Sequence, residues 1–257
     1  MENATVETYK ILEVCLLAGK IMLQSGAETY RVEDTMVRMA ASFGILETHS
    51  YVTPTGIIFS ADGEEPTKTK LIRISERSTD LKKVAMVNSI SRQISSGDVQ
   101  LHDALVELKQ IDSANITFPN WSQIAAASLA SGCFLIMYRG GWNDFLPAMA
   151  AGGLGYLGFV KFHRFVSIKF FSEFLASFII GLLSLLFVKI GWGHELDKII
   201  IGSLMTLVPG LLITNAVRDL MAGHLVSGLS KGAEAFLTAF AIGLGIAVVI
   251  TFFKVGI

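Results

Sequence analysis

The sequence predicts a membrane protein in which a cytoplasmic α+β domain precedes a bundle of about five transmembrane helices. Residues 1–118 carry 12 Lys or Arg and 16 Asp or Glu, whereas the longer remainder, 119–257, carries 9 and 6. Soluble domains average about 25% charged residues, so the second part is depleted. That part also holds several apolar runs near the length of about 20 residues that a membrane-spanning helix needs. Water around residues 1–118 and hydrocarbon around residues 119–257 account for both observations.

The overall composition excludes several classes of protein. A net charge of −1 gives no basic surface for nucleic acid. Cys15 and Cys133 fall in different parts of the chain and show no metal-ligand spacing, so the sequence predicts no metal and no cofactor. The first 20 residues lack the pattern of a signal peptide, and we therefore expect the N-terminus to stay in the cytoplasm.

Periodic apolar residues and β-branched runs define the elements of the first domain. Helices are expected where the apolar residues recur at helical spacing, at 6–25, 28–43, 79–96 and 100–111. Gly26 and Gly44 follow the first two helices, as glycine commonly does at a helix end. Three short antiparallel strands are expected at 45–53, 56–61 and 68–75. The pattern is typical of a three-stranded sheet with helices on one face.

The first domain shows no catalytic motif. It contains no nucleophile elbow, P-loop or H-E-x-x-H sequence, so we do not expect an enzyme. Glu28, Glu33 and Asp34 form either a carboxylate cluster or a solvated helix face, and we favour the second interpretation. Glu28 and Arg31 are three residues apart and can pair.

The second domain contains five apolar stretches. We expect spans at about 119–138, 142–160, 170–190, 199–217 and 233–253. The loop after the second span carries three basic residues and no acid, which favours its placement in the cytoplasm. Those residues are Lys161, Arg164 and Lys169.

Proline, glycine and polar residues interrupt the fourth stretch. Pro209 removes a backbone donor in mid-span, and Gly210 follows it. Asn215, Arg218 and Asp219 come one to two turns later. One interpretation is that Arg218 and Asp219 mark the cytoplasmic end of the span. We favour the other, a broken helix that lines a transport path.

Three further polar residues are candidates for this path. Ser227 lies between the fourth and fifth spans, Glu173 lies near the start of the third span, and Glu234 lies near the start of the fifth. The two glutamates also fit a purely interfacial position.

Two stretches resemble the threonine/serine exporter family, and specifically its N-terminal type of unit. The first is Ser25-Gly26-Ala27-Glu28-Thr29-Tyr30-Arg31-Val32-Glu33, followed by Val52-Thr53-Pro54-Thr55-Gly56-Ile57-Ile58. The second comprises Val208-Pro209-Gly210, Asn215-Ala216-Val217-Arg218-Asp219, Gly223-His224 and Ser227-Gly228. Gly26, Glu28 and Arg31 are the soluble-domain residues of this motif. The order of soluble domain, spans and late motif matches over nearly the whole chain.

The resemblance implies an exporter of small polar metabolites in the inner membrane, driven by the proton motive force. Family members are associated with threonine and serine efflux, and some two-component relatives with succinate efflux. Because the sequence stops after Phe253-Lys254, it resembles the larger subunit of the split arrangement, whose partner is a separate small polytopic membrane protein. A homo-oligomer is also compatible with the sequence.

The roles of the late residues follow from their chemistry. We expect Pro209 and Gly210 to open the helix and Asn215 to bind polar groups of the substrate. Arg218 would attract a carboxylate with its planar guanidinium. Asp219 would pair with Arg218 or take part in proton coupling. The alternatives are a membrane-anchored hydrolase and a sensory or structural membrane protein acting through its N-terminal domain.

Overall fold

A computed structural model describes residues 2–62, 67–165 and 170–253, and these form two compact units. The first unit comprises the chain up to Thr117 together with Leu211–Gly232, and the second comprises Phe118–Gly210 and the chain from Ala233 onward. Lys169 and Lys254, which the sequence analysis used, lie outside the described residues.

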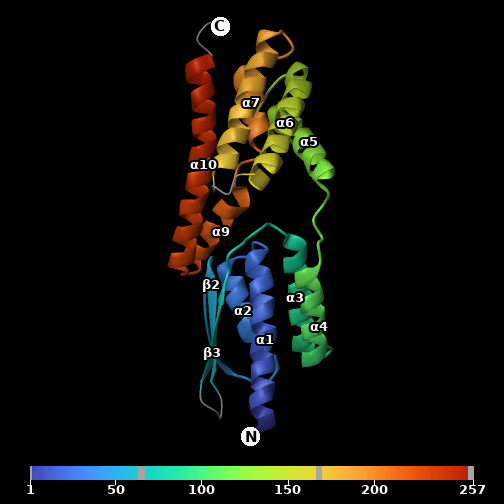
Figure 1. Ribbon diagram of the computed structural model, residues 1–257, viewed down its shortest axis with the longest axis vertical. Coiled ribbons are helices and arrows are strands. Elements are labelled where there is room, and N and C mark those ends of the chain that lie inside the picture. Colours follow the sequence, from blue (N-terminus) through green and yellow to red (C-terminus); the bar gives the residue numbers. More distant parts are fainter. Residues whose placement is uncertain (1, 63–66, 166–169, 254–257) are drawn as a thin grey trace. The chain divides into compact units, whose positions relative to one another are not determined.

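The first unit contains the predicted three-stranded antiparallel sheet, which is confirmed. Strands β1 (Glu47–Thr53), β2 (Gly56–Asp62) and β3 (Lys68–Arg73) pair in the order β1-β2-β3 (Figure 1). Side chains alternate across β2, so that Phe59 is fully buried while Ile58 is exposed. One face of the sheet therefore packs on the helices, and the other carries exposed residues.

Four helices complete this layer structure. Helices α1 (Glu2–Gln24) and α2 (Thr29–Ser42) contact the sheet, and α3 (Leu81–Ser96) and α4 (Leu101–Ser113) pack against α1. Figure 1 shows α3 and α4 side by side. Cys15 is fully buried in the core of this unit.

The turn between α1 and α2 is a glycine-terminated helix end. Gly26 adopts φ 89°, a left-handed conformation that glycine reaches without steric cost. The N–H of Ala27 donates back to the carbonyl of Met22 at 3.0 Å. This arrangement leaves the carbonyls of residues 24–27 pointing away from their own helix, so other segments can bind them.

The second unit is entirely helical in the described residues. It contains α5 (Asn120–Met137), the short helix η1 (Trp142–Asp144), α6 (Phe145–Phe165), α7 (Phe171–Lys189), α8 (Leu196–Leu204) and the later part of α10 (Leu225–Phe253). Glycines let neighbouring helices of this unit approach each other closely. A Cβ atom on Gly152 would collide with Ser131, and one on Gly155 would collide with Ile180. These close approaches are typical of membrane helices.

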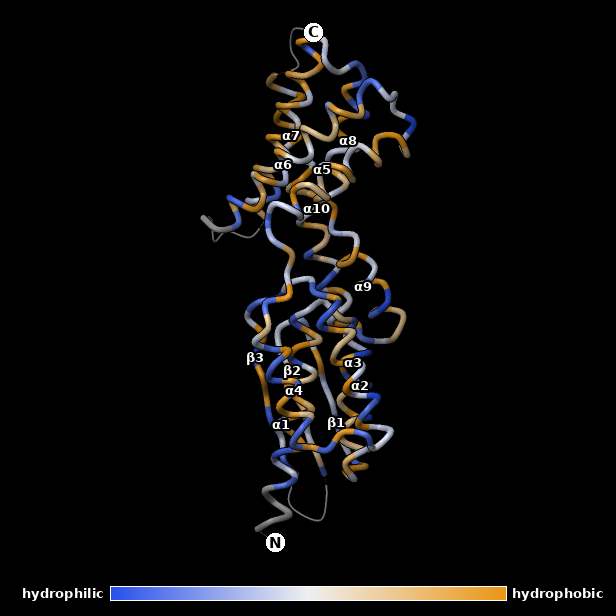
Figure 2. Tube along the Cα trace, turned by 90° about the vertical axis from the view of Figure 1, so that its right-hand side faces the viewer, coloured by the Kyte–Doolittle hydropathy of each residue, from blue (hydrophilic) through white to orange (hydrophobic). Residues whose placement is uncertain are grey.

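Three described helices are long and apolar enough to cross a membrane. They are Trp142–His163, Phe171–Lys189 and Leu225–Phe253, and Figure 2 shows the apolar character of α6 and α7. They correspond to the second, third and fifth predicted spans. Helix α5, with 18 residues, is not among them, so the topology of five spans stays a prediction.

The fourth predicted span, 199–217, is not a continuous helix. Helix α8 has 9 residues and ends at Leu204, which gives it a length of about 14 Å against the ~30 Å of a bilayer core. After an irregular segment through Pro209, α9 (Gly210–Met221) begins. Because proline lacks an N–H, it cannot continue a helix from the preceding turn.

Candidate functional site

The segment after the break packs within the first unit. Helix α9 is followed by Gly223, which adopts φ 87°, and the N–H of His224 donates to the carbonyl of Asp219 at 2.9 Å. Helix α10 then begins at Leu225. We call Leu211–Gly232 the α9–α10 hairpin. It lies against the α1–α2 turn, so the two sequence stretches that carry the family resemblance meet here.

A buried ion pair stands at the centre of this contact. The Asp219 carboxylate and the Lys231 ammonium are 2.7 Å apart, with side-chain exposures of 0% and 4%. The backbone N–H and the hydroxyl of Thr29 each donate to the same carboxylate at 2.9 Å. Lys231 also donates to the Thr29 hydroxyl at 3.1 Å. We call Thr29, Asp219 and Lys231 the Asp219 cluster.

The cluster is electrostatically well matched. Thr29 is the first residue of α2, whose unpaired N–H groups carry partial positive charge. The Asp219 carboxylate therefore faces an ammonium, a hydroxyl and a helix N-terminus, which together offset the cost of burying it. Such charge-assisted bonds are stronger than neutral ones.

A second ion pair lies beside the cluster. Arg218 binds one carboxylate oxygen of Glu28, and Arg31 binds the other at 3.3 Å. Although burial alone would raise the pKa of Glu28, the hydrogen bonds from the backbone and Arg218, with the charge of Arg31, lower it below its ordinary value. The Asn215 amide donates to the Gly26 carbonyl at 2.8 Å.

Two expectations need correction. The first alternative for Asp219, pairing with Arg218, is wrong, because Arg218 pairs with Glu28 while Asp219 pairs with Lys231. Neighbouring residues on a helix point in different directions, which separates the two side chains. The solvated-face interpretation holds for Asp34, which is exposed, and is wrong for Glu28, which is 5% exposed.

The hairpin also contacts strand β1 and helix α2. Ser227, a predicted candidate, is buried and donates to the Val52 carbonyl at 3.0 Å. The Val52 N–H donates to Glu33 at 2.9 Å, and His224 lies 3.7 Å from the same carboxylate. Burial and the charge of Asp219 raise the pKa of Glu33 above its ordinary value, against the opposing effects of Val52 and His224.

The remaining candidates lie elsewhere. Pro209 precedes α9 at the helix break, and Gly210 is its first residue. Glu173 lies in the first turn of α7, and Glu234 lies in the part of α10 that belongs to the second unit. Both glutamates are partly exposed.

Sequence reasoning missed Lys231 altogether and did not single out Thr29 as a site residue. Lys231 is the only charged residue between Asp219 and Glu234. A lone lysine in such an apolar run requires a buried partner or a route to water, and that requirement is the signal that could have identified it.

Known proteins match this chain over the region that contains both motif stretches. A family model described as "Putative threonine/serine exporter" matches residues 13–253. The chain is 26% identical to the "Probable succinate transporter subunit YjjP" of Klebsiella aerogenes, over 98% of the chain and 97% of that relative. It is also 26% identical to the protein of the same name from Escherichia coli, over 96% of each.

A longer relative matches across the same region. The chain is 25% identical to the "Probable threonine/serine exporter" of Mycobacterium tuberculosis, over 91% of the chain and 45% of that relative. No solved structure matches the chain. Because the family model covers both motif stretches and the helices that carry them, this protein belongs to the threonine/serine exporter family of membrane transporters.

Proposed function

We propose that the chain is the larger subunit of a secondary exporter for a small polar metabolite. The substrate would be an amino acid of the threonine/serine type or a dicarboxylate such as succinate, moved out across the cytoplasmic membrane by the proton motive force. The names of the relatives support this class, since two are called transporter subunits and one an exporter. In this proposal a separate small polytopic membrane protein supplies the second half.

The proposed topology follows the sequence analysis. Residues 1–118 form a cytoplasmic domain on which the α9–α10 hairpin packs, and the rest of residues 119–257 forms the transmembrane domain. The α9–α10 hairpin then links them, because its contacts lie within the first unit while the end of α10 belongs to the second.

One observation carries the proposed site, namely the burial of charge at the Asp219 cluster. Removing two charges from water costs several kcal/mol per ion, and apolar side chains of similar volume often stabilise a fold equally well. A buried ion pair is therefore weak support for stability alone. It agrees better with a specific role, because buried ionic groups are best known as switches or as groups that fix one arrangement of the chain.

Arg218 is the proposed substrate contact. Its side chain is 56% exposed although it binds the buried Glu28. A substrate carboxylate would replace Glu28 at the guanidinium, using the same planar geometry. Asn215 and Ser227 would supply neutral polar contacts, and the break at Pro209 and Gly210 would let α9 move relative to α8.

Asp219 is the proposed coupling residue. A proton on its carboxylate would end the ion pair with Lys231 and weaken both hydrogen bonds from Thr29. The α1–α2 turn and the hairpin would then separate more easily. Proton uptake and movement of the hairpin would thus be linked through one buried group.

Efflux from proteoliposomes tests the proposal. Purified protein, with and without the small membrane protein that copurifies with it, is reconstituted and loaded with labelled threonine, serine or succinate. We expect efflux of one of them to need both proteins and a proton gradient. Full transport by the single chain would contradict the proposal that the exporter needs a second subunit.

Variants test the residue roles in the same assay. Arg218→Ala and Asp219→Asn should abolish efflux while leaving the protein in the membrane. Arg92→Ala, at an exposed position of α3, is the control and should transport normally. Wild-type efflux in both site variants would reject the assigned roles.

A further inference from the structure

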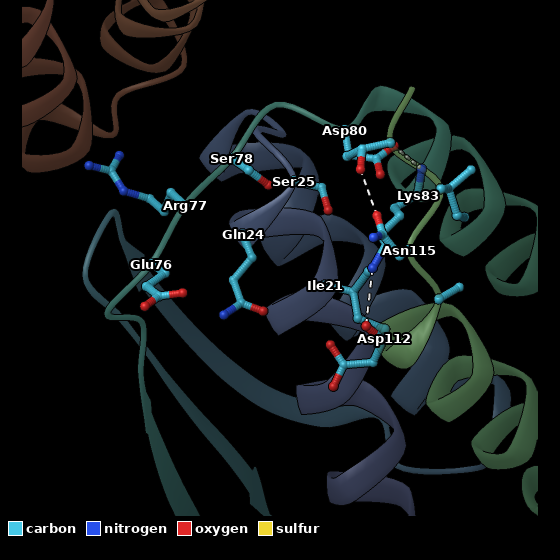
Figure 3. Close-up of a pocket in the computed structure, with 13 residues that line it drawn as sticks. Ile21, Gln24, Ser25, Glu76, Arg77, Ser78, Asp80, Lys83, Asp112 and Asn115 are labelled. Carbon is cyan, nitrogen blue, oxygen red and sulfur yellow. Dashed lines mark hydrogen bonds between the residues drawn. The ribbon is translucent and has the colours of Figure 1, made fainter. Parts of the chain in front are cut away.

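A polar pocket of about 280 Å³ lies in the first unit, on the opposite side of the α1–α2 turn from the Asp219 cluster. Its walls come from the end of α1, the segment before α3, the first turn of α3 and the end of α4 (Figure 3). Pockets for drug-sized ligands span about 300–1,000 Å³. This pocket is slightly smaller, so it fits a small metabolite.

The lining carries both signs of charge. The Lys83 ammonium donates to the Asp112 carbonyl at 3.1 Å, which leaves two of its three protons available. One Asp80 oxygen accepts the Lys83 N–H at 3.2 Å and caps α3, and the other is available. Glu76 is exposed and makes no ion pair with any described residue. A ligand with one positive and one negative group matches this lining.

The wall formed by the end of α1 is polar and partly unsatisfied. Ser25 is 3% exposed, and its hydroxyl has no hydrogen-bond partner among the described residues. Gln24 also lines the pocket, and Figure 3 shows its side-chain amide pointing away from Ser25. The Ser25 hydroxyl can therefore bind water or a polar ligand that enters the pocket.

The same turn connects the pocket to the Asp219 cluster. On the pocket side, the Gln24 carbonyl accepts the Ser78 N–H at 2.7 Å, and the Ser25 carbonyl accepts the Asp80 N–H at 3.0 Å. On the other side, the Gly26 carbonyl accepts the Asn215 amide, and the Ala27 carbonyl accepts Lys231 at 3.4 Å. Four successive carbonyls thus join the walls of the pocket to the α9–α10 hairpin.

We propose that this pocket is a regulatory site for a small zwitterionic amino acid. The ligand ammonium binds Asp80, its carboxylate binds Lys83, and Ser25 completes the contact. Occupation of the pocket fixes the α1–α2 turn and thereby changes the stability of the Asp219 cluster. The site is separate from the proposed transport path, because none of the residues proposed for that path lines it.

Calorimetric titration of the full chain in detergent tests the ligand class. The probes are L-serine as the zwitterion, succinate as the dianion and putrescine as the dication. We expect saturable binding of L-serine only. Asp80→Asn and Lys83→Gln should each weaken it by about tenfold, the effect of one charge-assisted hydrogen bond. Lys82→Gln, at an exposed neighbouring position outside the pocket, is the control and should bind normally.

Two further results decide between this site and the transport path. The titration is repeated with Arg218→Gln, which lacks the proposed substrate contact. L-serine should still bind this variant at the pocket, and hydrogen exchange should slow on binding at residues 24–27 and 76–83. If Arg218→Gln abolishes all L-serine binding while Asp80→Asn and Lys83→Gln do not weaken it, the ligand occupies the transport path and the inference is wrong. It is equally wrong if L-serine does not bind, or if succinate or putrescine binds in its place.

Discussion

Replacing Lys231 with methionine removes the ammonium and leaves the Asp219 carboxylate buried. In the native structure this carboxylate accepts from Lys231 at 2.7 Å and twice from Thr29 at 2.9 Å. The variant keeps only the Thr29 donors. Breaking a buried pair by removing one partner costs about 3–5 kcal/mol. At ~2–4 °C per kcal/mol for a chain of this size, the midpoint of thermal unfolding should fall by roughly 6–20 °C.

Removing both charges together should cost much less. Asp219→Asn alone leaves the ammonium buried and should be about as damaging as Lys231→Met. In the double variant no unpaired charge is left, and the loss reduces to about two hydrogen bonds, or ~1–3 kcal/mol. The sum of the single effects is about 6–10 kcal/mol, so the cycle should show a coupling energy of several kcal/mol.

Cys15 provides a probe for this measurement. Burial raises the pKa of its thiol to about 12, so the thiol is unreactive until the first unit opens. Cys133 is exposed and is replaced by serine. A fluorogenic maleimide then reports unfolding of the first unit during a temperature ramp in detergent.

A surface variant of α3 is the control for this measurement. Lys82→Met removes an exposed cation from α3 and should shift the midpoint by less than about 2 °C, as surface substitutions usually do. The reasoning is refuted if the single variants unfold with the wild type, or if the double variant loses the sum of the single losses.

Three further predictions concern the same contact. Gly26→Ala should destabilise the first unit more than Gly44→Ala in the thiol assay. Both glycines have φ near 90°, but a Cβ at Gly26 meets the Ser78 carbonyl at 3.4 Å, whereas a Cβ at Gly44 meets nothing within 4 Å. Equal losses of stability in the two variants would contradict this argument. Asn215→Leu should cost about 1–3 kcal/mol, because it leaves the Gly26 carbonyl without its donor, and a wild-type midpoint would show that the bond is dispensable. Because the pKa of Glu28 is lower in the folded protein than its ordinary value of 4.5, the ionised carboxylate stabilises the fold above pH 4.5. This contribution is lost as the pH falls through the lower native pKa. Glu28→Gln should therefore flatten the decline of the midpoint below pH 4.5, measured by circular dichroism, and an unchanged decline would count against the role of Glu28.

The elements of the first unit could be predicted because their signals are local. Gly26 and Gly44 each lie two residues after the last residue of α1 and of α2. The alternation of buried and exposed residues in β2 identifies a sheet with one covered face. These signals depend on neighbours within a few positions and need no knowledge of the rest of the chain.

Helix α9 shows why the fourth span could not be assigned from sequence. Its apolar residues, such as Val217, resemble part of a membrane span, yet the helix packs within the first unit. The buried face of α9 carries Asn215 and Asp219. Periodicity gives the two faces of a helix but does not say which neighbour each face meets.

The pairing of charges is equally nonlocal. Thr29 and Asp219 are 190 positions apart, and Asp219 and Lys231 are joined only through the turn at Gly223. Resemblance to a family placed both stretches among the important residues, but only the three-dimensional contact shows that they bind each other.

Efflux by the Asp219→Asn/Lys231→Met double variant tests the central claim most directly. Reconstituted with the proposed small membrane subunit, this variant lacks both buried charges but should retain its fold, as judged by the thiol assay. The account predicts that labelled substrate stays inside the proteoliposomes while the wild type releases it under a proton gradient. Release by the folded double variant at the wild-type rate would show that the buried pair serves packing alone.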